Sequence, residues 1–102
     1  MYETKRLYYE DVYKKEFTAR VLECRSRKKG YEVILDETAF YPEGGGQPSD
    51  MGTLDGIAVT EVQEKEGELL HYTVAPLEVG KSVVGKIDWE RRFDLMQQHS
   101  GE

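Results

Sequence analysis

The sequence predicts an all-β fold, a small six-stranded antiparallel β-barrel followed by the start of an α-helix. Three observations predict this fold: short segments in which apolar and polar residues alternate, turn-forming residues between these segments, and a change to helical spacing after Asp88. Short strands that recur about every 8 to 12 residues are typical of a closed or nearly closed antiparallel barrel. We therefore expect a barrel over residues 1–88 and a helix over residues 89–102.

Two strands are predicted early in the chain, on either side of a basic loop. One face of each strand is apolar, with Phe17, Ala19 and Val21 in the first and Tyr31, Val33 and Leu35 in the second. The loop between them, residues 25–30, is polar and ends in Gly30, which suits the positive φ of a hairpin loop. Residues 1–16 carry tyrosines among charged residues, and we expect an irregular or edge element whose tyrosines pack on the barrel rim.

Four further strands are expected at about residues 52–54, 57–63, 68–74 and 82–88. Asp55-Gly56 predicts a two-residue hairpin turn, and residues 65–67 and 76–80 predict longer connections. In the strand at 68–74, Leu70, Tyr72 and Val74 share one face. This places His71 on the opposite, polar face, as an exposed or barrel-lining side chain.

A helix is predicted after the last strand. Asp88 is a suitable N-cap, and Trp89, Phe93 and Met96 follow the i, i+4, i+7 spacing of one apolar helix face. Gly101 suits a helix C-terminus, but only one residue follows it, so no capping motif is completed. Either the helix frays at a natural terminus or the sequence was cut inside it, and we favour the cut.

The composition of the 102-residue chain limits its function. Its 38% hydrophobic residues suffice for one small core, and its formal net charge of −6 disfavours non-specific adhesion to nucleic acid or to an anionic membrane. No apolar run is long enough for a membrane-spanning helix or a signal-peptide core, so we expect a cytoplasmic protein with no membrane partner. The single cysteine, Cys24, excludes an internal disulfide and cannot alone form a Cys-rich zinc site.

The most unusual segment is the run Gly44, Gly45, Gly46 and Gln47, which lies between two prolines. Consecutive glycines let the backbone approach a ligand closely and expose N–H groups to an anion, which suits an RNA phosphate or a 3′ terminus. A sharply turned loop between two strands is the alternative. The spacing does not fit the dinucleotide-binding pattern G-x-G-x-x-G, and we expect a turn rather than a phosphate-binding loop at residues 79–82.

His99 is the remaining candidate for a metal ligand, and the basic residues of the predicted loop are candidates for contact with RNA. On the predicted helix, a metal ligand one turn beyond His99 would be residue 103, and one imidazole cannot hold zinc, which takes three or four protein ligands. A packed or surface residue is the alternative for His99. The basic residues of the loop can meet an RNA backbone or form a solvated hairpin tip, and Lys14 and Lys15 extend this patch only if the fold brings them near it. The basic loop residues are Arg25, Arg27, Lys28 and Lys29.

Two motifs in order carry a resemblance to a known family. The first is TAFYPEGGGQP at residues 38–48, followed by Asp50 and Gly52, and the second is DWERR with MQQHSG between residues 88 and 101. From about Thr4 to Glu102, the chain resembles the N-terminal part of an alanyl-tRNA editing protein of the AlaX type, and the related editing region of alanyl-tRNA synthetase. The resemblance implies an accessory β-barrel of the type shared with translation factors, then a zinc-dependent α/β editing domain whose first helix begins at residue 89.

That family hydrolyses tRNA(Ala) mischarged with serine or glycine, with a zinc site built from H-x-x-x-H and a later C-x-x-x-H. The resemblance makes His99 the first zinc ligand and associates Gly44 to Gln47 with the approach of the tRNA end. This sequence departs from the pattern because the second histidine and the C-x-x-x-H are absent, and Cys24 does not replace them. We therefore expect zinc and hydrolysis in the intact protein and neither in this fragment.

The leading hypothesis is an N-terminal fragment of an alanyl-tRNA editing hydrolase whose partner is the tRNA(Ala) acceptor end. Serine and glycine both remain candidate substrates, and both a free-standing protein and a synthetase region remain candidate parents. The alternatives are a free-standing RNA-binding β-barrel and a docking module whose helix face contacts a missing partner domain. An exposed helix also allows a homodimer.

Overall fold

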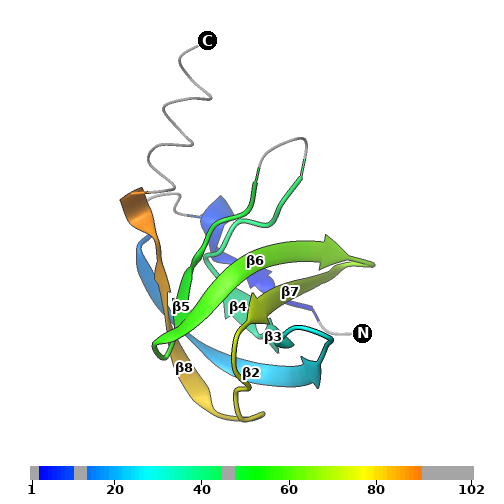
Figure 1. Ribbon diagram of the computed structural model, residues 1–102. Helices are drawn as coiled ribbons and strands as arrows, with labels where there is room; N and C mark the ends of the chain where they lie inside the picture. Colours follow the sequence, from blue (N-terminus) through cyan, green and yellow to red (C-terminus); the bar gives the residue numbers. More distant parts are fainter. Residues whose placement is uncertain (1–2, 11–13, 45–47, 91–102) are drawn as a thin grey trace.

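The dominant feature of the fold is a closed antiparallel barrel (Figure 1). The computed structural model describes residues 3–10, 14–44 and 48–90. The barrel order is β2-β3-β7-β6-β5-β8, and β8 pairs with β2 to close the sheet. This confirms the predicted all-β, six-stranded antiparallel arrangement. The six strands are β2 (Glu16–Ser26), β3 (Tyr31–Leu35), β5 (Gly52–Leu54), β6 (Ile57–Lys65), β7 (Glu68–Thr73) and β8 (Ser82–Ile87).

The turns between these strands follow the predicted chemistry. Asp55 has φ 52° and Gly56 has φ 82°, and both positive angles are what a two-residue hairpin turn between β5 and β6 requires. Gly30 closes the β2–β3 hairpin with φ 88°, where the Arg27 N–H donates to the Gly30 carbonyl at 2.9 Å. Local sequence therefore sets the connections of at least two of the hairpins.

A short two-stranded sheet lies beside the barrel. β1 (Lys5–Arg6) pairs in parallel with β4 (Glu37–Thr38), and a 3-10 turn, η1 (Leu7–Tyr9), follows β1. Leu7 and Tyr8 are buried, whereas Tyr9 is exposed. The N-terminal segment is thus an edge element whose tyrosine packs on the barrel, as the sequence predicted, but its parallel pairing with β4 was not foreseen.

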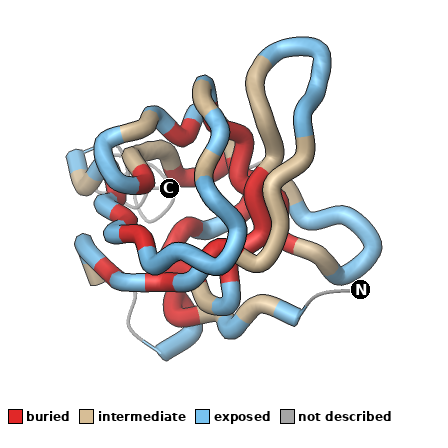
Figure 2. The backbone as a smooth tube through the Cα atoms, turned by 90° about the horizontal axis from the view of Figure 1, so that it is seen from below, coloured by how far each residue is buried: buried red, intermediate tan, exposed pale blue. Residues whose placement is uncertain are grey.

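The barrel interior is filled by apolar side chains from β2, β3, β5, β6 and β8, and buried and exposed residues alternate along much of the chain (Figure 2). A close fit in the interior is that between Phe17 of β2 and Gly85 of β8, which face each other in register. A Cβ at Gly85 would lie only 2.5 Å from the Phe17 ring, so this glycine makes room for the aromatic side chain. The Phe17 ring also contacts Phe40 edge-to-face, with 5.6 Å between centroids.

Two irregularities in the strands change which residues point inward. The register shifts between Val59 and Glu61 in β6, and between Val21 and Glu23 in β2. An extra residue in one strand moves the following side chains to the other face. For this reason Val59 and Val62, three positions apart, both lie in the core.

The two faces of β7 are arranged as predicted, and of the two outcomes expected for His71 the barrel-lining one holds. His71 is fully buried, in contact with the core residue Phe40 at 5.6 Å between ring centroids. Leu70 and Tyr72 lie on the other face, where they form a second, smaller apolar cluster with Ile34. Val74 is 61% exposed instead of sharing that buried face. The polar face of the predicted strand therefore lines the barrel, because a hydrogen-bonded imidazole fills interior space there.

Backbone hydrogen bonds hold the end of β8, where the chain leaves the barrel. The Ile87 N–H donates to the Lys15 carbonyl at 2.8 Å and the Asp88 N–H donates to the Met51 carbonyl at 2.7 Å. The Lys15 ammonium lies 5.3 Å from the centroid of the Trp89 ring. Trp89 and Glu90 are helical, and the rest of the predicted helix at 89–102 lies outside the described residues. Within the described ranges, no helix has the length and apolarity needed to cross a membrane.

Candidate nucleic-acid interface

The glycine-rich loop, residues 41–50, leaves the barrel between β4 and β5, and its two arms rise beyond the barrel (Figure 1). The arms are joined at their base by two hydrogen bonds. The Tyr41 N–H donates to the Asp50 carboxylate at 2.8 Å, and the Asp50 N–H donates to the Tyr41 carbonyl at 3.0 Å. Asp50 is only 4% exposed, so solvent screens this carboxylate little. The base of the loop is therefore closed by a local ring of hydrogen bonds.

Each arm of the loop is also bonded to the barrel wall at Val62 of β6. The Glu43 N–H donates to the Val62 carbonyl at 2.9 Å, and the Val62 N–H donates to the Ser49 hydroxyl oxygen at 3.0 Å. Ser49 is buried, and Gln63 donates from its amide to the Glu43 carboxylate. Because one strand residue serves both arms, the barrel sets the position of the two arms.

Among the predicted loop residues, the structure describes Gly44 alone. Gly44 is exposed, and a Cβ built on it would meet nothing within 4 Å. The protein's own packing therefore does not require a glycine there. Gly45, Gly46 and Gln47 lie outside the described residues, as does His99. Their predicted roles stay predictions.

A buried polar chain lies close to the loop base. The Phe40 N–H donates to the Thr38 hydroxyl oxygen at 3.1 Å, and Thr38 Oγ1 lies 2.8 Å from His71 Nε2. His71 Nδ1 lies 3.0 Å from the Val33 carbonyl oxygen, which can only accept. The hydrogen therefore sits on Nδ1, and Nε2 accepts from the Thr38 hydroxyl. The sequence placed His71 on one face of a predicted strand, and no spacing rule connected it with Thr38.

Burial also fixes the charge of this histidine. Desolvation lowers the pKa of His71 to about 4, although the hydrogen bond to the Val33 carbonyl opposes that shift. The imidazole is neutral at pH 7, and both ring nitrogens are occupied. His71 is therefore a structural residue of the loop support and offers no free nitrogen to a metal ion.

No zinc site is formed by the described part of the chain. Among those residues, there is no group of three or more His, Cys, Asp or Glu side chains able to hold a metal ion. Cys24 is half-buried in β2 and packs against the barrel core. The described residues therefore do not fit a zinc ion, and the predicted ligand His99 lies beyond them.

Two of the four basic residues of the hairpin tip contact other side chains. Arg25 lies within 3.7 Å of carboxylate oxygens of Glu23, Glu32 and Glu68. The Arg27 guanidinium lies 3.8 Å from the centroid of the Tyr72 ring. Lys14 and Lys15 precede β2, so the full length of that strand separates them from the tip, and they do not extend the patch. This arrangement favours a solvated hairpin tip over an extended phosphate-binding surface.

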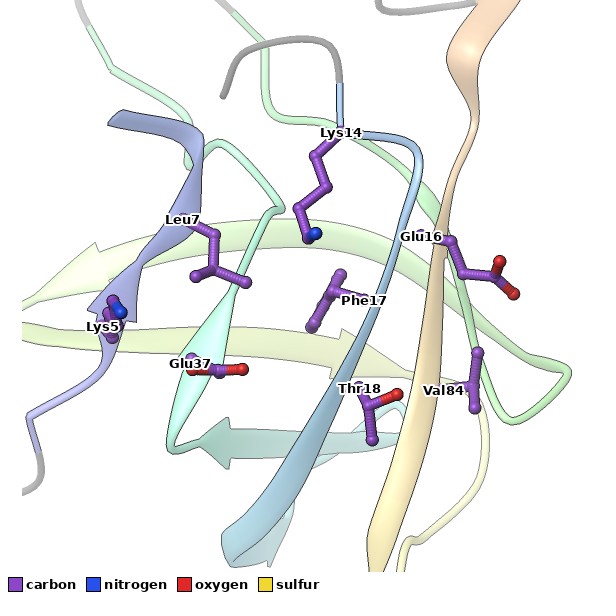
Figure 3. A pocket seen from close by; sticks show the side chains of 8 residues that line it. All are labelled: Lys5, Leu7, Lys14, Glu16, Phe17, Thr18, Glu37 and Val84. Atoms are coloured by element: carbon purple, nitrogen blue, oxygen red, sulfur yellow. The ribbon is translucent and has the colours of Figure 1, made fainter. Parts of the chain in front are cut away.

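A groove of about 650 Å³ lies between the small β1–β4 sheet and the start of β2 (Figure 3). Its floor includes Leu7 and Phe17, and its rim carries two lysines and two glutamates. The Lys14 side chain extends over the floor toward Phe17 (Figure 3). Both signs of charge are present, so the groove has no uniform preference for an anion or a cation. The charged rim residues are Lys5, Lys14, Glu16 and Glu37.

The chain matches a known protein family over most of its length. The profile of the family described as "tRNA synthetases class II (A)" matches residues 2–91, and the chain belongs to this family. The match covers the whole barrel with the bonded base of its glycine loop. The matched residues include the first sequence motif and the start of the second.

The individual relatives include alanyl-tRNA editing proteins and an alanine–tRNA ligase. The chain is 46% identical over 101 residues to the alanyl-tRNA editing protein AlaX-M of Pyrococcus horikoshii, covering 96% of this chain and 45% of that protein. It is 42% identical over 105 residues to the alanyl-tRNA editing protein Aarsd1 of Bos taurus, covering 90% of this chain and 24% of that protein. An alanine–tRNA ligase of Haloquadratum walsbyi is 45% identical over 102 residues, which are 96% of this chain and 11% of the ligase.

These matches confirm the resemblance to AlaX-type editing proteins and to alanyl-tRNA synthetase. The chain spans less than half the length of each of these three relatives. In all three, the matching portion covers at least 90% of this chain. The barrel is therefore a unit shared by editing proteins and by a ligase.

Proposed function

We propose that the chain is the barrel part of an alanyl-tRNA editing hydrolase, which removes serine or glycine from mischarged tRNA(Ala) in the cytoplasm. The observation that carries this proposal is the identity of 42–46% with two proteins named alanyl-tRNA editing proteins, over at least 90% of this chain. The alanine–tRNA ligase relative supports the same tRNA as partner.

The barrel's part in this function is to hold the glycine loop. Tyr41, Ser49 and Asp50 close the base of the loop, and Val62 bonds both arms to β6. A loop whose base is held in this way can bind a ligand without the cost of ordering that base at the moment of binding. We propose that Gly44 to Gln47 approach the acceptor end of tRNA(Ala).

Zinc belongs to this proposal as a cofactor of the intact protein, with His99 as one ligand. Bound zinc supplies a Lewis acid for ester hydrolysis. The described barrel residues form no zinc site, so we expect the 102-residue chain alone to hydrolyse no aminoacyl ester. Its own residues position the loop, and the hydrolytic groups lie elsewhere.

The alternative of an RNA-binding module that acts through the basic tip has less support. Arg25 is shared among three carboxylates and Arg27 lies on an aromatic ring, so two of the four cations already have partners. Salt-dependent binding of an acceptor stem that is lost when Lys28 and Lys29 are replaced would favour that alternative.

The proposal is tested with a chimera in which this chain replaces the matching segment of the Pyrococcus horikoshii AlaX-M protein. We expect the zinc-loaded chimera to release serine or glycine from mischarged tRNA(Ala), and we expect a chelator to abolish the release. The 102-residue chain, assayed in parallel with zinc, should release neither amino acid. A chimera that is folded by circular dichroism and binds zinc but hydrolyses neither ester contradicts the proposal.

A further inference from the structure

Three tyrosines form a cluster on the surface beside the glycine loop. Tyr8 is 2% exposed, and its ring contacts Tyr9 at 4.8 Å and Tyr41 at 4.7 Å between centroids. Tyr9 is 69% exposed and Tyr41 is 45% exposed. One buried ring therefore supports two aromatic side chains that remain open to solvent.

The Arg6–Glu64 ion pair links the buried ring of the cluster, Tyr8, to the barrel. The Arg6 guanidinium donates to the Glu64 carboxylate of β6 at 2.8 Å and to the Tyr8 hydroxyl oxygen at 3.4 Å. Arg6 holds the pKa of the Glu64 carboxyl below its usual range, and burial raises the pKa of Tyr8 to about 12. Tyr8 thus stays protonated and neutral at physiological pH, and the charged pair links its hydroxyl to the barrel wall.

The two exposed rings are fixed in the backbone as well as through Tyr8. Tyr41 is the first residue of the glycine loop, and its N–H and carbonyl both bond Asp50. Tyr9 ends η1, whose turn is closed by the Glu10 N–H donating to the Leu7 carbonyl at 2.9 Å. Little conformational freedom remains to be lost when a flat ligand stacks on these rings.

We infer that Tyr9 and Tyr41 form a stacking platform for unpaired nucleotides at the 3′ end of an RNA. Aromatic rings bind unpaired bases regardless of sequence because every base has a π-face. This inference rests on the proposed function and deepens it, because it assigns the recognition of the single-stranded acceptor end to two residues outside the glycine run. Tyr41 and Gly44 lie on the same arm of the glycine-rich loop, so a base on the tyrosines and a phosphate near Gly44 can belong to one strand.

Charge near the platform is mixed, and this shapes the expected binding. Lys5 and Lys14 line the groove beside η1, but Glu16 and Glu37 line it too, and Lys5 lies 3.5 Å from Glu10. Few phosphates are therefore neutralised, and we expect the affinity to depend only weakly on salt. A platform that works by stacking differs in this respect from a basic patch.

The test uses the 102-residue chain and two RNA hairpins with the same stem, one with a short unpaired 3′ overhang and one blunt-ended. We expect the overhang hairpin to shift the Tyr9 and Tyr41 ring signals in NMR spectra, and to bind at least about tenfold more tightly than the blunt hairpin. Tyr9→Ala and Tyr41→Ala should each weaken overhang binding about tenfold, which lies within the range of about 5- to 150-fold that a base–aromatic stack contributes. Tyr9→Phe and Tyr41→Phe keep the ring and should retain the affinity, as should the control Val79→Ala, which changes another exposed apolar side chain.

Several outcomes overturn the inference. Equal binding of the two hairpins, unchanged affinity in both alanine variants, or no binding at millimolar RNA each refute a stacking platform. Sedimentation that changes with Tyr9→Ala would instead assign these rings to contact with a second copy of the chain. In the chimera, mischarged-tRNA hydrolysis with a KM that both alanine variants leave unchanged refutes the platform and leaves the proposed function intact. An inactive chimera together with ring-dependent overhang binding refutes the proposed function alone.

Discussion

Acidification should destabilise the barrel through His71. Burial lowers the pKa of this imidazole from 6.5 to about 4. Between these two values the unfolded chain takes up a proton that the folded protein excludes, so the free energy of unfolding falls as the pH falls. From pH 7 to pH 5 this single group should remove about 2 kcal/mol of stability, and the loss should be complete only below pH 4.

The measurement is urea unfolding at pH 7 and at pH 5, followed by far-ultraviolet circular dichroism. Carboxylates also titrate in this range, so the comparison is with the double variant Thr38→Val/His71→Leu, which removes both side-chain partners together. The wild type should lose about 2 kcal/mol more than the double variant over the same pH change. An NMR titration gives an independent answer, because the His71 ring signal should stay unchanged down to about pH 5. A ring that titrates near pH 6.5, or equal pH dependence in the two proteins, refutes the reasoning.

Two further predictions concern packing. Gly52→Ala places a Cβ 1.9 Å from the Lys86 carbonyl oxygen, whereas Gly44→Ala meets nothing within 4 Å. Urea unfolding should show a loss of about 3 kcal/mol or more for the first variant and less than about 0.5 kcal/mol for the second, and equal losses would contradict the packing described. Arg27→Ala removes a cation from the Tyr72 ring and should lower the free energy of unfolding by about 0.5–1 kcal/mol. Arg27→Lys should lower it by less. An alanine variant as stable as the wild type would show that the contact contributes nothing to stability.

Much of the barrel could be predicted because its strands and turns are determined by residues that are close together in the sequence. Alternation marked β2 and β3, and the Asp55-Gly56 pair set the β5–β6 hairpin through two positive φ angles. These features depend on residues close together in sequence, where side-chain periodicity and turn chemistry act directly. The strand ends differ by one or two residues, as for β6, which runs on to Lys65.

Long-range features escaped the sequence patterns. The parallel pairing of β1 with β4 involves only two residues on each side, too few to show any periodicity. The sequence left His71 either exposed or barrel-lining, because nothing in it reveals that Thr38 and Val33 supply partners for both ring nitrogens. A buried polar residue is tolerated only when such partners exist, and the fold brings them together from distant positions.

The candidate site was predicted through its motif, and its support was found only in the structure. The glycine run was recognisable as a continuous segment, but its attachment to β6 runs through Val62, an ordinary strand residue. The tyrosine cluster joins Tyr8 and Tyr9 to Tyr41 across more than thirty positions of the chain, a distance at which no spacing rule applies. Aromatic residues in a charged N-terminal segment indicated only that some tyrosine would pack on the rim.

The most direct test of the central claim is the ratio of ester hydrolysis rates for Ser-tRNA(Ala) and Ala-tRNA(Ala) in the AlaX-M chimera that carries this barrel. An editing hydrolase must remove the wrong amino acid and spare the right one. We predict rapid release of serine or, on Gly-tRNA(Ala), of glycine, with alanine left attached. A folded, zinc-loaded chimera that hydrolyses all three esters equally, or none of them, contradicts the assignment of this barrel to an alanyl-tRNA editing protein.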